Sequence, residues 1–98
     1  MDFSEIRNHY ERLVSEYLRD NVIPNMPDKD ENFFLDIACI ALNRLPPRYI
    51  RNAVDMSFYL QDDERDKLQE QVKDAVEEAT RYIEKNYNSN GRYDFSSQ

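Results

Sequence analysis

Apolar side chains recur at helical spacing in three stretches, which predicts three principal helices near residues 4–20, 30–44 and 62–87. Ser4 is the candidate N-cap of the first helix. Its apolar positions are Ile6, Tyr10, Leu13, Val14, Tyr17 and Leu18. The second helix is apolar on most of its surface, which is typical of a central core helix. It should end before Pro46 and Pro47, because proline lacks an N–H donor and disfavours helical geometry in the preceding residue.

The third helix, with Asp62 as its candidate cap, carries a heptad-like apolar seam. The seam consists of Leu68, Val72, Ala75, Ala79, Tyr82 and Asn86, broadened by Val76 and Ile83. Two short helices would leave part of this seam uncovered, so we expect a homodimer.

The remaining segments are less regular. Pro24 and Pro27 mark a connector between the first two helices. Residues 48–60 suit an extended piece or a short helix, with a candidate short strand near 54–59. Residues 88–98 are predicted to be a flexible tail. The expected fold is all-α, or mostly α: one small domain of three to four helices over residues 1–87, with a long C-terminal helix.

Composition narrows the function classes. Gly91 is the only glycine, which argues against a P-loop or a Rossmann fingerprint. The net charge of −7 disfavours binding to DNA or RNA polymers, whose affinity depends on neutralising phosphates. No apolar run reaches the roughly 20 residues of a membrane span, and the acidic start lacks a signal peptide, so we expect a cytoplasmic protein.

The sequence offers little for catalysis. Cys39 and His9 are the only cysteine and the only histidine, and they lie on different predicted helices. Cys39 falls in an apolar run, where a buried and inert cysteine is the usual interpretation. One Cys and one His cannot form a four-ligand zinc site within one chain. We therefore expect neither an enzyme nor a bound metal.

Residues 37–54 hold three arginines and no Asp or Glu. Arg44 closes the second helix, where a cation is favoured by the helix dipole. Arg48 and Arg51 follow the prolines, where that explanation fails, and Tyr49 lies between them. Two interpretations remain open: a phosphate or nucleotide site, or structural ion pairs with this acidic chain.

The stretch Ala41-Leu42-Asn43-Arg44-Leu45-Pro46-Pro47-Arg48-Tyr49 resembles the signature of the late competence protein ComFB family. The likeness covers roughly residues 5–85. It implies a small, mostly helical, dimeric protein, and several members are receptors for cyclic dinucleotides, chiefly cyclic di-GMP. Some members carry several cysteines before the second helix and bind zinc. This chain has Asp28 to Phe33 there, so zinc and other cofactors are not expected.

The resemblance and the arginines indicate the same segment. Arg44, Arg48 and Arg51 could pair with phosphates or with guanine O6 and N7. Tyr49 and Tyr59 could stack on a purine, and Asp55 could accept from guanine N1 and N2. The candidate ligand-binding residues are Asn43, Arg44, Pro46, Pro47, Arg48, Tyr49, Arg51, Asp55 and Tyr59.

We therefore expect a non-enzymatic, homodimeric receptor for cyclic di-GMP that relays the level of this second messenger to an unidentified protein partner. The sequence does not exclude cyclic di-AMP. The alternative is a dimeric helical adaptor without a nucleotide ligand. In that case Leu45 to Tyr49 is only a rigid corner, and a partner binds the acidic face.

Overall fold

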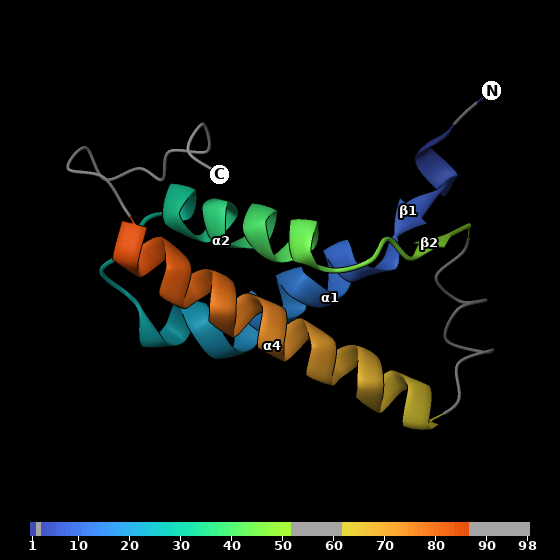
Figure 1. The fold of residues 1–98 in the computed structure, drawn as a ribbon. Coiled ribbons are helices and arrows are strands. Elements are labelled where there is room, and N and C mark those ends of the chain that lie inside the picture. Colours follow the sequence, from blue (N-terminus) through green and yellow to red (C-terminus); the bar gives the residue numbers. More distant parts are fainter. Residues whose placement is uncertain (2, 52–61, 87–98) are drawn as a thin grey trace.

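The computed structural model describes residues 1, 3–51 and 62–86. Three α-helices and one two-stranded sheet form the framework of this part of the chain (Figure 1). In chain order the elements are a 3₁₀ turn (Phe3–Glu5), β1 (Arg7–Asn8), α1 (His9–Tyr17), a π-helical turn (Leu18–Val22), a 3₁₀ turn (Ile23–Asn25), α2 (Glu31–Arg44), β2 (Tyr49–Ile50) and α4 (Asp62–Asn86). The mostly helical fold with a long C-terminal helix is therefore confirmed. None of the described helices is both long and apolar enough to span a membrane.

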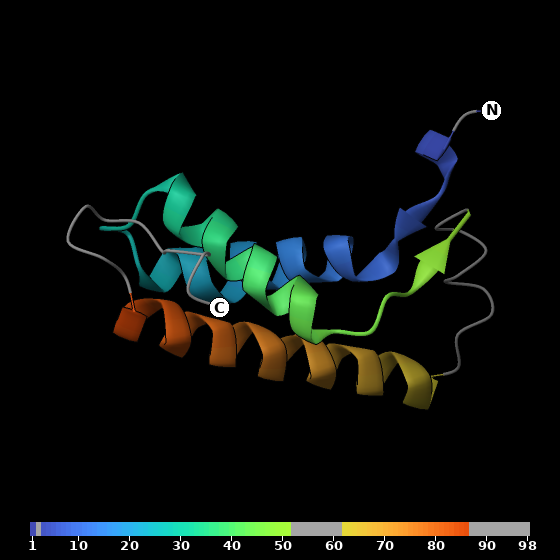
Figure 2. The ribbon, with the colours of Figure 1, turned by 45° about the horizontal axis from the view of Figure 1, so that its top comes forward.

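Helices α1 and α2 lie side by side on one face of α4 (Figures 1 and 2). α2 runs in the opposite direction to α1 and α4 (Figure 1). The core lies where the three helices meet, and α4 contributes Leu68, Val72, Ala75, Val76, Ala79 and Ile83 to it. These residues include most of the seam from which a dimer was predicted. Because α1 and α2 bury these described seam residues within one chain, the seam gives no support for a second copy, and the homodimer stays a prediction.

The start of the first helix differs from the prediction. Ser4 lies in a 3₁₀ turn, and α1 begins at His9. Asn8 is the N-cap, since its Oδ1 accepts a hydrogen bond from the Tyr10 amide at 3.2 Å. Ile6, which the periodicity placed on the helix, is 45% exposed. The N-cap residue Asn8 has an extended backbone, and Arg7 and Asn8 form strand β1 in place of a helical turn.

The second and third helices agree with the predicted ranges. Asp30 caps α2 by accepting from the Phe33 amide at 3.0 Å. The helix ends at Arg44, and Leu45 is extended, as expected before Pro46. Helix α4 begins at Asp62 itself.

The sheet consists of β1 and β2, which pair antiparallel with Arg7 opposite Ile50 and Asn8 opposite Tyr49. It joins the start of α1 to the segment that follows α2, although about 40 residues separate the two strands in sequence. The predicted strand near 54–59 and the predicted tail at 88–98 lie outside the described residues.

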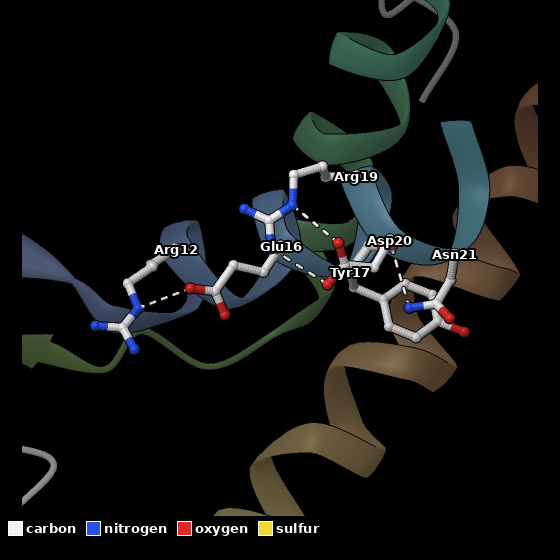
Figure 3. Close-up of polar contacts among 6 residues, drawn as sticks. All are labelled: Arg12, Glu16, Tyr17, Arg19, Asp20 and Asn21. Carbon is white, nitrogen blue, oxygen red and sulfur yellow. Dashed lines mark hydrogen bonds and ion pairs between the residues drawn. The ribbon is translucent and has the colours of Figure 1, made fainter. Parts of the chain in front are cut away.

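Charged side chains on α1 and the π-helical turn pair along their own element (Figure 3). Arg12 Nε lies 3.1 Å from Glu16 Oε1, and Arg19 Nε lies 2.9 Å from Asp20 Oδ1. All four side chains are well exposed to solvent, so these pairs add little stability. Arg44 and Arg48 behave differently, because their side chains reach across to α4.

Candidate functional site

A pocket of about 270 Å³ lies beside the double proline. It is built from α1, from residues 45–48 between α2 and β2, and from the N-terminal half of α4. We call residues 45–48 the proline segment. In Figure 2 that segment passes over the N-terminal half of α4. The lining residues are Tyr10, Pro46, Pro47, Arg48, Glu64, Lys67, Leu68 and Gln71.

The backbone of Arg48 is held firmly against the start of α1. Its amide donates to Asn8 Oδ1 at 3.1 Å, and its carbonyl accepts from the His9 amide at 2.7 Å. Asn8 therefore caps α1 and anchors the proline segment with one side chain. The sheet pairing of Asn8 with Tyr49 continues this attachment. As a result, the position from which the Arg48 side chain extends is fixed by α1.

The guanidinium of Arg48 is only loosely held. Its Nη2 lies 3.9 Å from Glu64 Oε2, and both side chains are about half exposed. Lys67, one turn further along α4, lines the same pocket. Of the described residues, two cations and one carboxylate therefore face a shared space, and the excess positive charge among them favours an anionic ligand.

Tyr10 and Gln71 form a well-defined wall of the pocket. The Tyr10 hydroxyl donates to Gln71 Oε1 at 2.6 Å, and Tyr10 is 2% exposed. Burial raises the pKa of the Tyr10 hydroxyl above its usual value, whereas the charge of Arg48 lowers it. The hydroxyl is therefore protonated at neutral pH, and its bond to Oε1 leaves the Gln71 amide nitrogen as a donor.

Arg44 lies at another part of α4. Its Nη1 is 3.6 Å from Glu78 Oε2, and its guanidinium lies 5.4 Å from the centre of the Tyr82 ring. Glu78 and Glu64 are about 21 Å apart along the helix axis at a rise of about 1.5 Å per residue. The structure thus separates Arg44 from Arg48 and explains Arg44 by contacts within the fold.

The other predicted site residues that the structure describes do not line this pocket. Asn43 is exposed, and its Nδ2 lies 3.9 Å from Cys39 Sγ on the same helix. Tyr49 in β2 is 67% exposed, and Arg51 is also exposed. Asp55 and Tyr59 lie outside the described residues. Of the nine candidates, the structure brings together Pro46, Pro47 and Arg48.

Sequence reasoning missed four polar lining residues: Tyr10, Glu64, Lys67 and Gln71. Tyr10 was assigned to the apolar face of the first helix, and Glu64 belongs to the acidic start of α4, where charged residues are common. Lys67 and Gln71 flank Leu68 at a spacing of four, so they share one side of α4. That spacing was a usable signal, but nothing in the sequence indicated which partner this side faces.

His9 on α1 and Cys39 on α2 lie in different environments. His9 is 6% exposed, and its Nδ1 has no hydrogen-bond partner among the described residues. Burial lowers the pKa of His9, and the charges of Arg12 and Arg48 lower it further, against a small opposing effect of Glu16. Cys39 is exposed, which corrects its assignment to the core. Within residues 1, 3–51 and 62–86, no group of three or more His, Cys, Asp or Glu side chains could hold a metal ion.

Comparison with known proteins identifies one family. The model of the family described as "Late competence development protein ComFB" matches residues 7–87 of the 98. No match was found among curated proteins or among solved structures. The matched range contains every element from β1 to α4 and all of the lining residues of the pocket.

Proposed function

This chain belongs to the late competence development protein ComFB family, and on that premise we propose that it is a non-enzymatic receptor for a cyclic dinucleotide, chiefly cyclic di-GMP. One observation carries the proposal. Pro46, Pro47 and Arg48, from the stretch that resembles the family signature, line a pocket together with the second cation Lys67. A rigid corner alone would not require a cation directed at a shared cavity.

Phosphate recognition suits this pocket. A guanidinium can donate two parallel hydrogen bonds to one phosphodiester, and Lys67 adds a second positive charge. Gln71 supplies a neutral donor from the opposite wall, because its oxygen is occupied by Tyr10. Donors of this kind also match the acceptors O6 and N7 of guanine.

The size of the pocket limits how much of the ligand it encloses. About 270 Å³ lies just below the range of roughly 300–1,000 Å³ that is usual for small-molecule sites. A phosphate with part of one nucleoside fits this space, whereas a complete cyclic dinucleotide extends beyond it. The exposed ring of Tyr49 is available to stack on a purine outside the pocket.

Ligand binding would couple three parts of the chain. The pocket joins α1, the proline segment and α4, so a bound anion favours the arrangement in which all three stay together. A ligand shifts such an equilibrium only by its difference in affinity for the two states. We propose that an unidentified protein partner recognises the ligand-stabilised arrangement.

We also propose that the receptor is a homodimer, with a contact surface other than the α4 seam. A groove of about 580 Å³ between α1 and α2 is lined largely by apolar residues, among them Ile23, Phe34 and Leu35. Leu35 is 57% exposed and Ile23 is 42% exposed. Sedimentation should give about twice the chain mass of 11.8 kDa, and Leu35→Glu should give the monomer. A parent protein that stays monomeric at high micromolar concentration would contradict this part of the proposal.

Calorimetric titration of the purified chain with cyclic di-GMP tests the main proposal. We expect saturable binding that weakens as salt rises, because charged contacts dominate. A parallel titration with cyclic di-AMP decides the base preference. If neither dinucleotide binds at tens of micromolar, the adaptor function takes the place of the receptor function.

A further inference from the structure

Among the described residues, Glu64 is the only carboxylate that lines the pocket. It lies in the first turns of α4, whereas Arg48 follows the double proline. The distance of 3.9 Å between Arg48 Nη2 and Glu64 Oε2 therefore links two walls of the same cavity. An anion of the chain itself stands next to the cation that a ligand phosphate would require.

The link is weak enough to be exchanged. The Arg48 side chain is 46% exposed and the Glu64 side chain is 53% exposed, so water screens their attraction. The distance of 3.9 Å also exceeds that of a charge-assisted hydrogen bond. A phosphodiester that accepts two hydrogen bonds from one guanidinium makes a stronger contact than this pair.

We propose that Glu64 is an internal competitor of the ligand. Its carboxylate neutralises Arg48 in the empty pocket, and a phosphate must displace it before it can pair with Arg48. This inference rests on the proposed function, because it concerns the same pocket, and it adds how the affinity of that pocket is set. A molecule in which Arg48 is paired with Glu64 is not ready to bind the ligand. The apparent affinity is therefore lower than that of a pocket in which Arg48 is always available.

The competition has a consequence for signalling. While Glu64 is paired with Arg48, the first turns of α4 are linked to the proline segment. A bound phosphate pairs with Arg48 in place of Glu64. The Glu64 carboxylate then lies near a second negative charge, and the repulsion favours movement of the Glu64 side chain away from the pocket. Ligand occupancy thus changes a contact between two elements and not only the surface of one.

Glu64→Gln is the decisive variant, since it removes the charge and keeps the shape of the side chain. We expect cyclic di-GMP to bind about three- to tenfold more tightly, because a competing ion pair and a like charge are both lost. Glu78→Gln is the matched control. It makes the same charge change on the same helix and also disrupts an arginine pair, that of Arg44 at 3.6 Å, but Glu78 does not line the pocket. Its affinity should stay within twofold of the parent.

Calorimetry tests the receptor proposal and the competitor proposal separately. The parent and both variants are titrated with cyclic di-GMP and, in a second series, with inorganic pyrophosphate. Tighter binding of either anion by Glu64→Gln alone supports the competitor. If only pyrophosphate binds and Glu64→Gln tightens it, the receptor proposal fails and the competitor stands. If cyclic di-GMP binds the parent and Glu64→Gln binds it equally or more weakly, the competitor is overturned and the receptor proposal stands. An equal gain in Glu78→Gln, or no gain with either anion, also overturns it.

Discussion

Arg44 and Arg48 are four residues apart, yet they belong to different regions of the molecule. On an unbroken helix this spacing would place both side chains on one face. Pro46 and Pro47 end α2 between them, and the chain then extends toward the start of α1. Arg44 consequently reaches Glu78 and Tyr82, whereas Arg48 reaches the pocket near Glu64.

The two arginines also differ in which part of the residue is held in place, the side chain in Arg44 and the backbone in Arg48. The side chain of Arg44 has two partners on α4, an ion pair and an aromatic ring. Arg48 has its backbone anchored by Asn8 and His9, while its guanidinium has a loose contact at 3.9 Å. A fixed backbone with an exchangeable side chain suits ligand binding, and a doubly held side chain suits stability. A run of like charges in sequence is therefore not a cluster of charges in space.

The largest effect expected from this difference is on ligand affinity. Arg48→Ala should weaken cyclic di-GMP binding about tenfold to a hundredfold, because a charge-assisted contact contributes roughly 1.5–3 kcal/mol. Arg44→Ala should change the affinity less than threefold. Calorimetry on both variants measures the contrast. Equal losses would show that the ligand contacts both arginines, and the separation of the two regions would have no functional meaning.

Lys67 should contribute less than Arg48, because an ammonium makes no bidentate contact. We expect Lys67→Gln to weaken cyclic di-GMP binding about three- to tenfold, since exposed charges are screened by water. Lys73→Gln is the control, as it removes the same charge from an exposed position of α4 outside the pocket lining. If the two variants weaken binding alike, the effect is one of net charge, and Lys67 has no special place in the site.

The two alanine variants should rank in the opposite order when stability is measured, with the larger loss in Arg44→Ala. Arg44→Ala loses an exposed ion pair and an aromatic contact, which together contribute about 1 kcal/mol. For a domain of this size that lowers Tm by roughly 4–8 °C. Arg48→Ala should lower it by less, because its pair with Glu64 is longer and both partners are about half exposed. Thermal unfolding followed by circular dichroism checks this, and a larger loss in Arg48→Ala would assign a structural role to Arg48.

The sequence predicted the helices well because their signals are local. The cap at Asp30, the stop before Pro46 and the apolar period of α4 each depend on residues a few positions apart. The start of α1 was missed because Ser4 and Asn8 both suit an N-cap. The choice of Asn8 depends on its bond to the Arg48 amide, 40 residues away. The double role of Asn8 is visible only in the folded chain.

The pocket could be predicted only on one side. The wall that contains Pro46 to Arg48 is continuous in sequence and carries a distinctive motif. The opposite wall joins Tyr10 to Gln71 across 61 residues, and neither belongs to a motif. Burial was misjudged for Cys39, which lies in an apolar run but on the exposed side of α2. Periodicity gives the faces of a helix, whereas the partner of each face follows from tertiary packing.

The smallest expected effect concerns His9, whose amide is bonded to the Arg48 carbonyl. Burial lowers the pKa of His9 below 6.5, with further lowering by Arg12 and Arg48, and Arg44 is not among the causes. Arg48→Ala should therefore raise the pKa of His9 part of the way back, and Arg44→Ala should leave it unchanged. NMR titration of the imidazole measures both shifts. A shift of equal size in the two variants would contradict the separate positions of the two arginines.

The lowered pKa of His9 also makes the free energy of unfolding depend on pH. In the unfolded chain His9 takes up its proton near pH 6.5, before the folded chain does. The free energy of unfolding contributed by His9 is therefore fully present above pH 6.5 and falls as the pH drops toward the lowered folded pKa. Arg48→Ala should reduce this loss, and His9→Gln should abolish it, whereas Arg44→Ala should keep the slope of the parent. Urea unfolding between about pH 7.5 and pH 5.5 measures the slope. If Arg48→Ala keeps the slope of the parent, the charge of Arg48 does not act on His9, and the lowered pKa of His9 is due to its burial and to Arg12.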